Sequence, residues 1–110
     1  MPDQKTELLQ GTLDLLVLRL LRRGPLNGWD VTQALGAASK GALVVNYGSV
    51  YPALRRLEHR GCVRGEWRVT DNNRRARYYE LTATGRRQLD AERKQWERFS
   101  EAVGLILGAD

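Results

Sequence analysis

Leucines with helical spacing dominate the start of the chain. From about Glu7 to Arg23, apolar residues recur at intervals of three and four and cover most of a helix circumference. A helix of this kind is buried on more than one side, so we expect it to pack against its own domain and against a second chain. Gly24 and Pro25 end it, and a second helix is predicted from about Asn27 to Ala38. The inner face of this second helix is expected to consist of Trp29, Val31, Ala34 and Leu35.

A brief apolar run precedes a third helix that carries its own start and stop signals. Leu43-Val44-Val45 is apolar and β-branched, which predicts a short strand. Ser49 is suited to cap the helix that follows, and Pro52 would then lie in the first turn, where its missing N–H costs nothing. Gly61 suits the left-handed residue that commonly ends a helix.

The third helix separates into an apolar and a polar face. Val50, Leu54 and Leu57 gather on one side at helical spacing. The opposite side is predicted to present Pro52, Arg55, Arg56 and His59, with Ser49 and Tyr51 on the flanks. An α-helix fits the major groove of DNA, where two guanidinium groups could bridge guanine O6 and N7 or hold a phosphate. The alternative is a solvated basic face on an ordinary amphipathic helix.

The pattern changes to a period of two after Gly61. Residues 62–69 and 76–81 alternate as strands do, and the polar run 70–74 between them has the composition of a turn. They predict a hairpin with Arg74 and Arg75 at its tip. A hairpin alone is marginal in water, so it must pack on the helices, and we expect Tyr79 and Leu81 to face inward.

The last segment reads as one long helix from a cap at Thr82 to about Leu107, with Gly85 as a weak point near its start. Its apolar residues repeat almost as a heptad and cannot be buried by the helix alone. A partner helix from a second chain is the interpretation that we prefer. The alternative is that the helix folds back on the first helix of its own chain. The residues of this seam are Leu89, Trp96, Phe99, Val103 and Ile106.

Charge is concentrated in one part of the chain. The 110 residues carry a net charge of +5, and residues 47–79 hold eight arginines against three acidic residues, which accounts for the whole excess. This distribution is typical of a nucleic-acid-binding surface. An anionic membrane surface is less suitable as a partner, because the arginines do not line one helix beside an apolar face.

Composition narrows the remaining classes of protein. The single cysteine, Cys62, and the single histidine, His59, exclude an intrachain disulfide and argue against a zinc site, so we expect no metal and no cofactor. Cys62 is expected to be a buried side chain at the start of a strand, with a redox-sensing thiol as the alternative. No apolar run is long enough to span a membrane and the start does not resemble a signal peptide, so a cytoplasmic protein is expected.

The order of elements predicts a fold class. Three helices followed by a basic hairpin is the arrangement of a winged helix-turn-helix domain, a mainly α fold with a small β-hairpin. We expect residues 1–82 to form this DNA-binding domain and residues 83–110 to form a C-terminal dimerisation helix. Two such units would face a two-fold symmetric DNA site.

Four stretches resemble the PadR family of transcriptional regulators: residues 9–18 (LQGTLDLLVL), 24–29 (GPLNGW), 47–58 (YGSVYPALRRLE) and 77–82 (RYYELT). Trp29 departs slightly from the family, which more often has Tyr there. The resemblance covers about residues 8–103. It implies a dimeric bacterial or archaeal DNA-binding regulator, usually a repressor, whose C-terminal helix packs against the first helix of its partner. One C-terminal helix is similar to the short branch of the family.

The family resemblance and the pattern of apolar and polar residues together assign DNA contacts and dimer contacts to individual residues. The resemblance assigns DNA contacts to Ser49, Tyr51, Pro52 and Arg55 in the third helix and to Arg74, Arg75 and Arg77 in the hairpin; the polar face of the helix adds Arg56. For the dimer, the resemblance assigns Trp96, Phe99 and Val103, and the apolar pattern adds Leu9, Leu13, Leu16, Leu89 and Ile106. Trp96 and its symmetry mate could also line a pocket for a small hydrophobic or aromatic effector, although aromatic residues at a seam more often belong to the core.

The sequence favours one of three functions. A DNA-binding regulator, usually a repressor that blocks polymerase at an operator, agrees best with the concentrated arginines. A winged-helix protein-interaction module without DNA binding is the alternative, because a fold does not determine a function. An enzyme is not expected, since the sequence offers no nucleophile–base pair, no paired carboxylates and no phosphate-binding glycine loop.

Overall fold

The computed structural model describes residues 10–108. Within that range the chain forms four helices and a three-stranded antiparallel sheet with the strand order β1-β3-β2. The elements are α1 (Gln10–Leu21), β1 (Leu26–Asn27), α2 (Gly28–Ala38), α3 (Tyr47–His59), β2 (Val63–Val69), β3 (Arg75–Leu81) and α4 (Ala83–Gly108).

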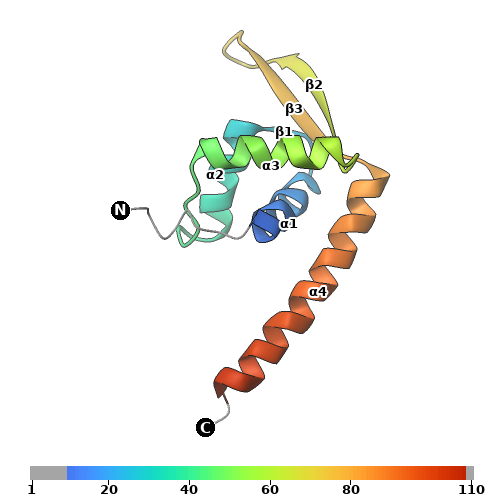
Figure 1. Cartoon of the computed structure of the whole chain (residues 1–110). Helices are drawn as coiled ribbons and strands as arrows, with labels where there is room; N and C mark the ends of the chain where they lie inside the picture. The colour runs from blue at the N-terminus through green and yellow to red at the C-terminus, as the bar shows by residue number, and fades with distance from the viewer. Residues whose placement is uncertain (1–9, 109–110) are drawn as a thin grey trace.

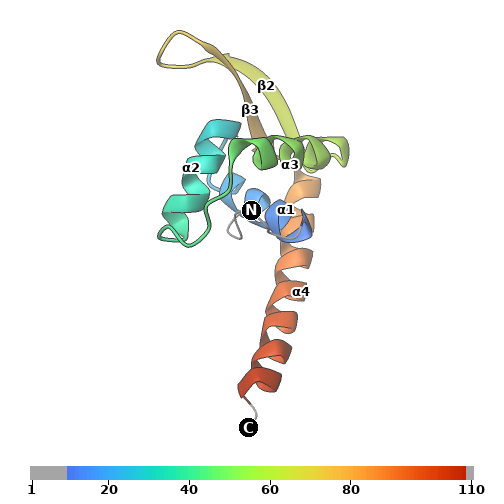
Figure 2. The same cartoon turned by 60° about the vertical axis from the view of Figure 1, so that its left-hand side comes forward.

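The molecule has three parts that both views separate clearly. Helices α1, α2 and α3 form the body, the β2–β3 hairpin rises from one side of it, and α4 leaves on the other side (Figures 1 and 2). The extents of 57 × 35 × 21 Å reflect these two projections. The fold is the mainly helical winged helix-turn-helix with a C-terminal helix, which confirms the predicted fold class.

The core lies where the three helices of the body meet the base of the hairpin. It is built from the apolar face that the helical spacing indicated in α3, together with one side of α1, the inner side of α2 and one tyrosine of the hairpin. The buried side of α1 is not the predicted one, because Leu16 and Leu20 are only half-buried whereas Val17 and Leu21 are buried. The first turns of α4 complete it through Leu89. Its main members are Leu13, Val17, Leu18, Leu21, Val31, Leu35, Val50, Leu54, Leu57 and Tyr79.

Two predictions about the first two helices are corrected by the structure. Helix α1 ends at Leu21 rather than Arg23, and the expected start near Glu7, with Leu9, lies outside the described residues. Trp29 does not belong to the inner face of α2, because its side chain is 61% exposed. It is near the start of the helix, where the buried side is supplied by Val31 and Leu35.

The expected strand at Leu43-Val44-Val45 does not form. Residues 42–46 connect α2 to α3 without regular structure, and only Val45 among them is buried. The sheet consists of β1, β3 and β2, so this run pairs with no strand. The short strand is β1 instead, whose residues Leu26 and Asn27 pair with Tyr79 and Tyr78 of β3. The Asn27 side chain then caps α2 by accepting a 2.8 Å hydrogen bond from the Asp30 N–H.

Helix α3 begins three residues earlier than predicted. Its cap is Asn46, whose side chain accepts a 3.0 Å hydrogen bond from the Ser49 N–H, so the prediction of Ser49 as the cap is wrong. Pro52 therefore lies in the second turn and leaves the Gly48 carbonyl without its usual helical donor. Gly48 is exposed, so water can satisfy that oxygen. The predicted stop is confirmed: Gly61 has φ +77° and Cys62 N–H bonds back to Leu57 O at 2.8 Å.

A tight joint connects the hairpin to α4. The Thr82 hydroxyl accepts a 3.0 Å hydrogen bond from the Gly85 N–H, which confirms the predicted cap, and donates a 2.6 Å hydrogen bond to the Gly61 carbonyl. Gly85 is not the weak point that the sequence suggested. A Cβ at this position would lie 2.0 Å from the Cys62 carbonyl oxygen, so the absence of a side chain lets α4 pack against the start of β2.

The hairpin extends beyond the helical body. Tyr79 at its base is buried, as predicted, and Leu81 is half-buried. Towards the tip no helix covers the sheet, so Trp67 and Val69 are exposed although they occupy the apolar positions of β2. We call residues 63–81 the wing.

Candidate nucleic-acid interface

A groove of about 580 Å³ lies between α3 and the wing. One wall is the exposed side of α3, and the other is the face of the sheet that carries Trp67, Arg77 and Tyr79. The groove is open to solvent and contains charged, aromatic and hydrogen-bonding groups. Its lining residues are Tyr51, Arg55, Glu58, His59, Trp67, Arg77 and Tyr79.

Arg55 is the exposed guanidinium of α3. It lies 5.9 Å from the ring centre of Tyr51, one turn earlier in the helix, and it makes no ion pair within residues 10–108. Tyr51 and Pro52 are exposed beside it, and Ser49 is partly covered by its contact with Asn46. These four predicted DNA contacts therefore lie on one side of α3, with Arg55 able to extend away from the protein.

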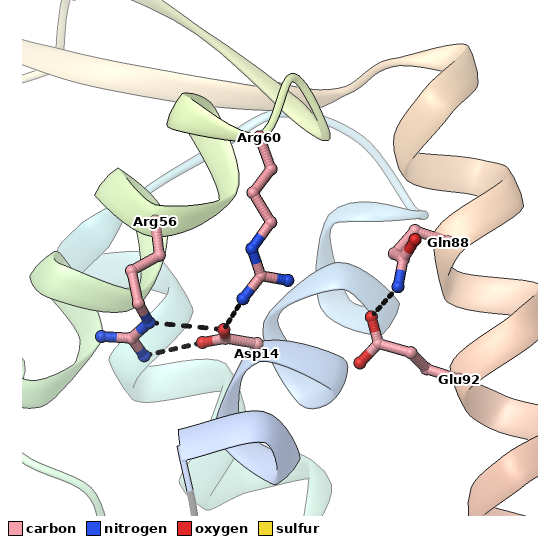
Figure 3. Close-up of polar contacts among 5 residues, drawn as sticks. All are labelled: Asp14, Arg56, Arg60, Gln88 and Glu92. Atoms are coloured by element: carbon pink, nitrogen blue, oxygen red, sulfur yellow. Dashed lines mark hydrogen bonds and ion pairs between the residues drawn. The ribbon is translucent and has the colours of Figure 1, made fainter.

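Arg56 has a different position from the one predicted. Its guanidinium points toward α1 and donates hydrogen bonds to Asp14, from Nε to Oδ2 at 3.3 Å and from Nη2 to Oδ1 at 2.7 Å (Figure 3). The prediction of a second outward guanidinium on this face is wrong. The physical reason is the buried Asp14 carboxylate, which needs a counter-charge.

The three predicted arginines of the wing also differ from one another. Arg74 and Arg75 are exposed near the tip, and Arg75 lies 5.3 Å from the ring centre of Trp67. Arg77 turns toward α3 and donates a 2.5 Å hydrogen bond to Glu58, which raises the pKa of its guanidinium above the usual range. Arg77 thus connects the wing to α3, whereas the two tip arginines face solvent.

Exposed aromatic residues were missed by the sequence reasoning. Trp29, Tyr47 and Trp67 surround a second hollow of about 260 Å³ between the starts of α2 and α3 and the wing, where Arg75 also lies. The apolar pattern predicts Trp29 on the inner face of α2 and assigns no DNA contact to Tyr47 or Trp67. The signal that could have found Trp67 is the length of the hairpin, because seven-residue strands outreach the helical body that covers their base.

The predicted dimer residues fall into two groups. Leu13 and Leu89 are buried in the core of their own chain, so they offer no surface to a second one, and Leu16 is half-buried. Along α4, by contrast, Phe99 is 61% and Ile106 is 75% exposed. Trp96 is exposed beside Phe99, and Val103 is partly covered. Beyond Leu89, α1 of the same chain therefore does not bury the seam. Trp96 and Phe99 instead border a hollow of about 390 Å³, whose other side is lined by Thr12 and Leu15 of α1.

None of the helices between residues 10 and 108 combines the length and the apolar character that crossing a bilayer requires.

A family model and several solved structures identify the family of the chain. The model of the transcriptional regulator PadR-like family matches residues 17–91. A PadR family transcriptional regulator from Eggerthella lenta is 31% identical, with a TM-score of 0.78 over 91% of this chain and 85% of that one. A PadR-like transcriptional regulator from Bacillus cereus has the same fold, with 24% identity and a TM-score of 0.80 over 96% and 100% of the two chains. A curated protein of Lysinibacillus sphaericus is 20% identical over 103 residues, 94% of each chain. The family consists of DNA-binding regulators rather than enzymes, and the chain belongs to this PadR-like family of transcriptional regulators.

Proposed function

We propose that the protein is a homodimeric repressor that binds a two-fold symmetric operator and thereby excludes RNA polymerase. The observation that carries the proposal is the groove between α3 and the wing, which the outward guanidinium of Arg55 borders. The exposed Arg74 and Arg75 lie beyond this groove, near the tip of the wing. A repressor of this kind acts on chromosomal DNA, and so in the cytoplasm.

The two sides of the groove are suited to different DNA contacts. Helix α3 would enter the major groove, where Arg55 can bridge guanine O6 and N7, with Ser49, Tyr51 and Pro52 near the bases or the backbone. Arg74 and Arg75 would meet phosphates or the neighbouring minor groove, whose negative potential attracts arginine. Arg56 and Arg77 are occupied by Asp14 and Glu58, so we assign them to the support of α3 rather than to direct contacts.

The dimer would form through α4. Its seam exposes Trp96, Phe99 and Ile106, and burying such residues against a second copy is the ordinary way to remove them from water. Residues 83–110 would then be the dimerisation helix and residues 1–82 the DNA-binding domain, although Leu89 contributes to the core of that domain. Two-fold symmetry of the dimer would be matched by a palindromic operator.

We further propose a site for a small effector beside α4. The hollow beside Thr12, Leu15, Trp96 and Phe99 is apolar and lies next to the expected dimer contact, which favours a flat hydrophobic or aromatic compound. Binding there would release the operator. Quenching of tryptophan fluorescence by such compounds, retained in the wild type and lost in Trp96→Leu, is the expected result; Trp29 and Trp67 need their own substitution controls.

The test of the main proposal is binding of duplex DNA. Duplexes selected from a random library, and the DNA just upstream of the reading frame, are titrated by fluorescence anisotropy against shuffled sequences over a salt series. We expect tight, sequence-dependent binding with a steep salt slope and a palindromic selected site. Equal affinity for all duplexes would contradict an operator, and no binding at low salt would support a protein-interaction role instead.

A further inference from the structure

Asp14 is the one charged side chain that is buried in the described part of the chain, with 1% of its surface exposed. It lies on α1 and faces α3, and its arginine partners are Arg56 in that helix and Arg60, the residue that caps the C-terminal end of α3 (Figure 3). Arg56 holds both carboxylate oxygens, and Arg60 donates from Nη2 to Oδ2 at 3.3 Å. The carboxylate is thus fully engaged by two guanidinium groups.

An ion pair is a costly way to join two helices. Removing a carboxylate from water carries a large penalty, and apolar residues of similar volume often stabilise a core at least as well. What a buried pair can add is a fixed arrangement of the elements that carry it. The rest of the contact between α3 and the body is apolar, through residues such as Val50, Leu54 and Leu57, and such contacts have no direction of their own.

The positions of Arg56 and Arg60 are suited to fixing the orientation of α3 on α1. Arg56 and Arg60 are one turn apart and converge on a single carboxylate, so together they limit both rotation of α3 about its axis and sliding along it. Arg55 precedes Arg56 directly. A rotation of α3 that breaks the bidentate contact would therefore also change the direction in which Arg55 leaves the helix.

We propose that Asp14 is a positioning residue for DNA recognition, which fixes the orientation of α3 through Arg56 and Arg60 so that Arg55 meets base edges. The same contacts hold two guanidinium groups away from phosphates, where they would add affinity for any sequence. The inference rests on the proposed function, because it concerns how α3 discriminates an operator from other DNA.

The test substitutes Asp14→Asn, which keeps the size of the side chain and removes its charge. Anisotropy titrations measure the affinity for the selected operator and for a shuffled duplex over a salt series, with the folded fraction taken from circular dichroism. We expect the ratio of the two affinities to fall about tenfold, the discrimination of one good base contact. Affinity for the shuffled duplex should not fall, and its salt slope should steepen by about 0.9 for each released guanidinium that reaches a phosphate.

Glu97→Gln is the matched control. It makes the same chemical change and the same change of net charge at the exposed Arg93–Glu97 pair of α4, away from Asp14, α3 and the wing. Its ratio of affinities should stay within about twofold of the wild type. A purely structural role of Asp14 would lower both affinities of the variant equally, in proportion to the lost folded protein, and would overturn the inference.

Arg60→Gln keeps the test decisive if Asp14→Asn does not fold. Arg60 has half of its side chain exposed, and Arg56 still neutralises Asp14 in this variant. We expect a smaller loss of discrimination with an unchanged salt slope; a slope lower by about 0.9 would show instead that Arg60 contacts phosphate. A wild-type protein without any sequence preference would overturn the repressor proposal and this inference together. Preserved discrimination in Asp14→Asn would overturn this inference alone.

Discussion

At the residue scale, the arginines near the groove are held by two kinds of partner. Arg55 and Arg75 lie over the rings of Tyr51 and Trp67, whereas Arg56 is bound to a carboxylate. A cation–π contact at an exposed site is worth about 0.5–1 kcal/mol, so a base or a phosphate can replace it at little cost. Leaving a buried carboxylate without its partner costs about 3–5 kcal/mol. The first two arginines are therefore available to DNA, and Arg56 is not.

The first prediction concerns Arg55, whose contact with Tyr51 is easily replaced by a contact with DNA. Arg55→Ala should weaken operator binding by roughly 1–3 kcal/mol and relax the sequence preference at one position, because a base contact is lost. Titration of the operator and of single-base variants by anisotropy measures both effects. An unchanged preference would mean that Arg55 does not contact a base.

Substitutions at the wing tip should behave differently. Arg74→Ala and Arg75→Ala should each weaken binding to operator and shuffled duplex alike and reduce the salt slope by about 0.9, because the lost partner is a phosphate. The same titrations over a salt series check this. Loss of affinity for the operator alone would place the wing on base edges instead.

We expect Cys62 to make the free energy of unfolding depend on pH in the alkaline range. Burial raises the pKa of its thiol above the usual 9.0, more strongly than neighbouring Arg60 lowers it, and Glu92 and Asp14 raise it further. The unfolded chain loses this proton first, so the resulting stabilisation is complete below about pH 9 and is lost as pH rises through the folded-state pKa. We expect the free energy of unfolding to decline above pH 9, and less steeply in Cys62→Ala.

Denaturant unfolding at several pH values measures that decline. The comparison is cleanest below about pH 10, because burial also raises the pKa of Tyr79 above its usual 10.0, which adds a second loss at higher pH. Identical slopes for the wild type and Cys62→Ala between these values would exclude the thiol as the cause.

At the scale of elements, the joint between the wing and α4 depends on one missing side chain. Gly85→Ala would place a methyl group against the Cys62 backbone carbonyl, where no side chain can move aside. We expect a loss of about 3 kcal/mol in the free energy of unfolding, measured by denaturant or thermal unfolding. Gly36→Ala is the control, since nothing lies within 4 Å of that position in α2, and it should be neutral or stabilising by up to about 1 kcal/mol. Equal effects of the two changes would show that the joint tolerates a side chain.

The helices and the wing could be predicted because their patterns are local. Spacing of apolar residues located α1, α3 and α4, and turn residues located the hairpin. Features that depend on distant partners could not be predicted in this way. Strand β1 exists because Leu26 meets Tyr79, and Arg56 turns inward because Asp14, 42 positions earlier, lies buried beside it. The outward direction of Trp29 likewise depends on which side of α2 the rest of the body covers.

At the scale of the whole molecule, α4 is the element that the single chain leaves incomplete. Phe99→Asp should convert a dimer to monomer by placing a charge in the seam, and it should weaken operator binding because the two units no longer bind together. Light scattering coupled to size exclusion measures the mass. Lys94→Asp, on the side of α4 away from the seam, makes a larger change of charge and should leave the dimer intact. A dimeric Phe99→Asp protein would exclude this seam as the interface.

The small share of α4 that packs against the body has an evolutionary consequence. Only the first turns of α4 enter the core, and the remainder projects from it (Figure 1). In the proposed dimer, an insertion of about seven residues in α4 would preserve the facing of the seam, lengthen the helix by about 10 Å and leave α3 and the wing untouched. Mutations in α4 could then change the spacing between half-sites, and separate mutations in α3 could change the bases that are read within each half-site. Related regulators could acquire new target genes through either kind of mutation.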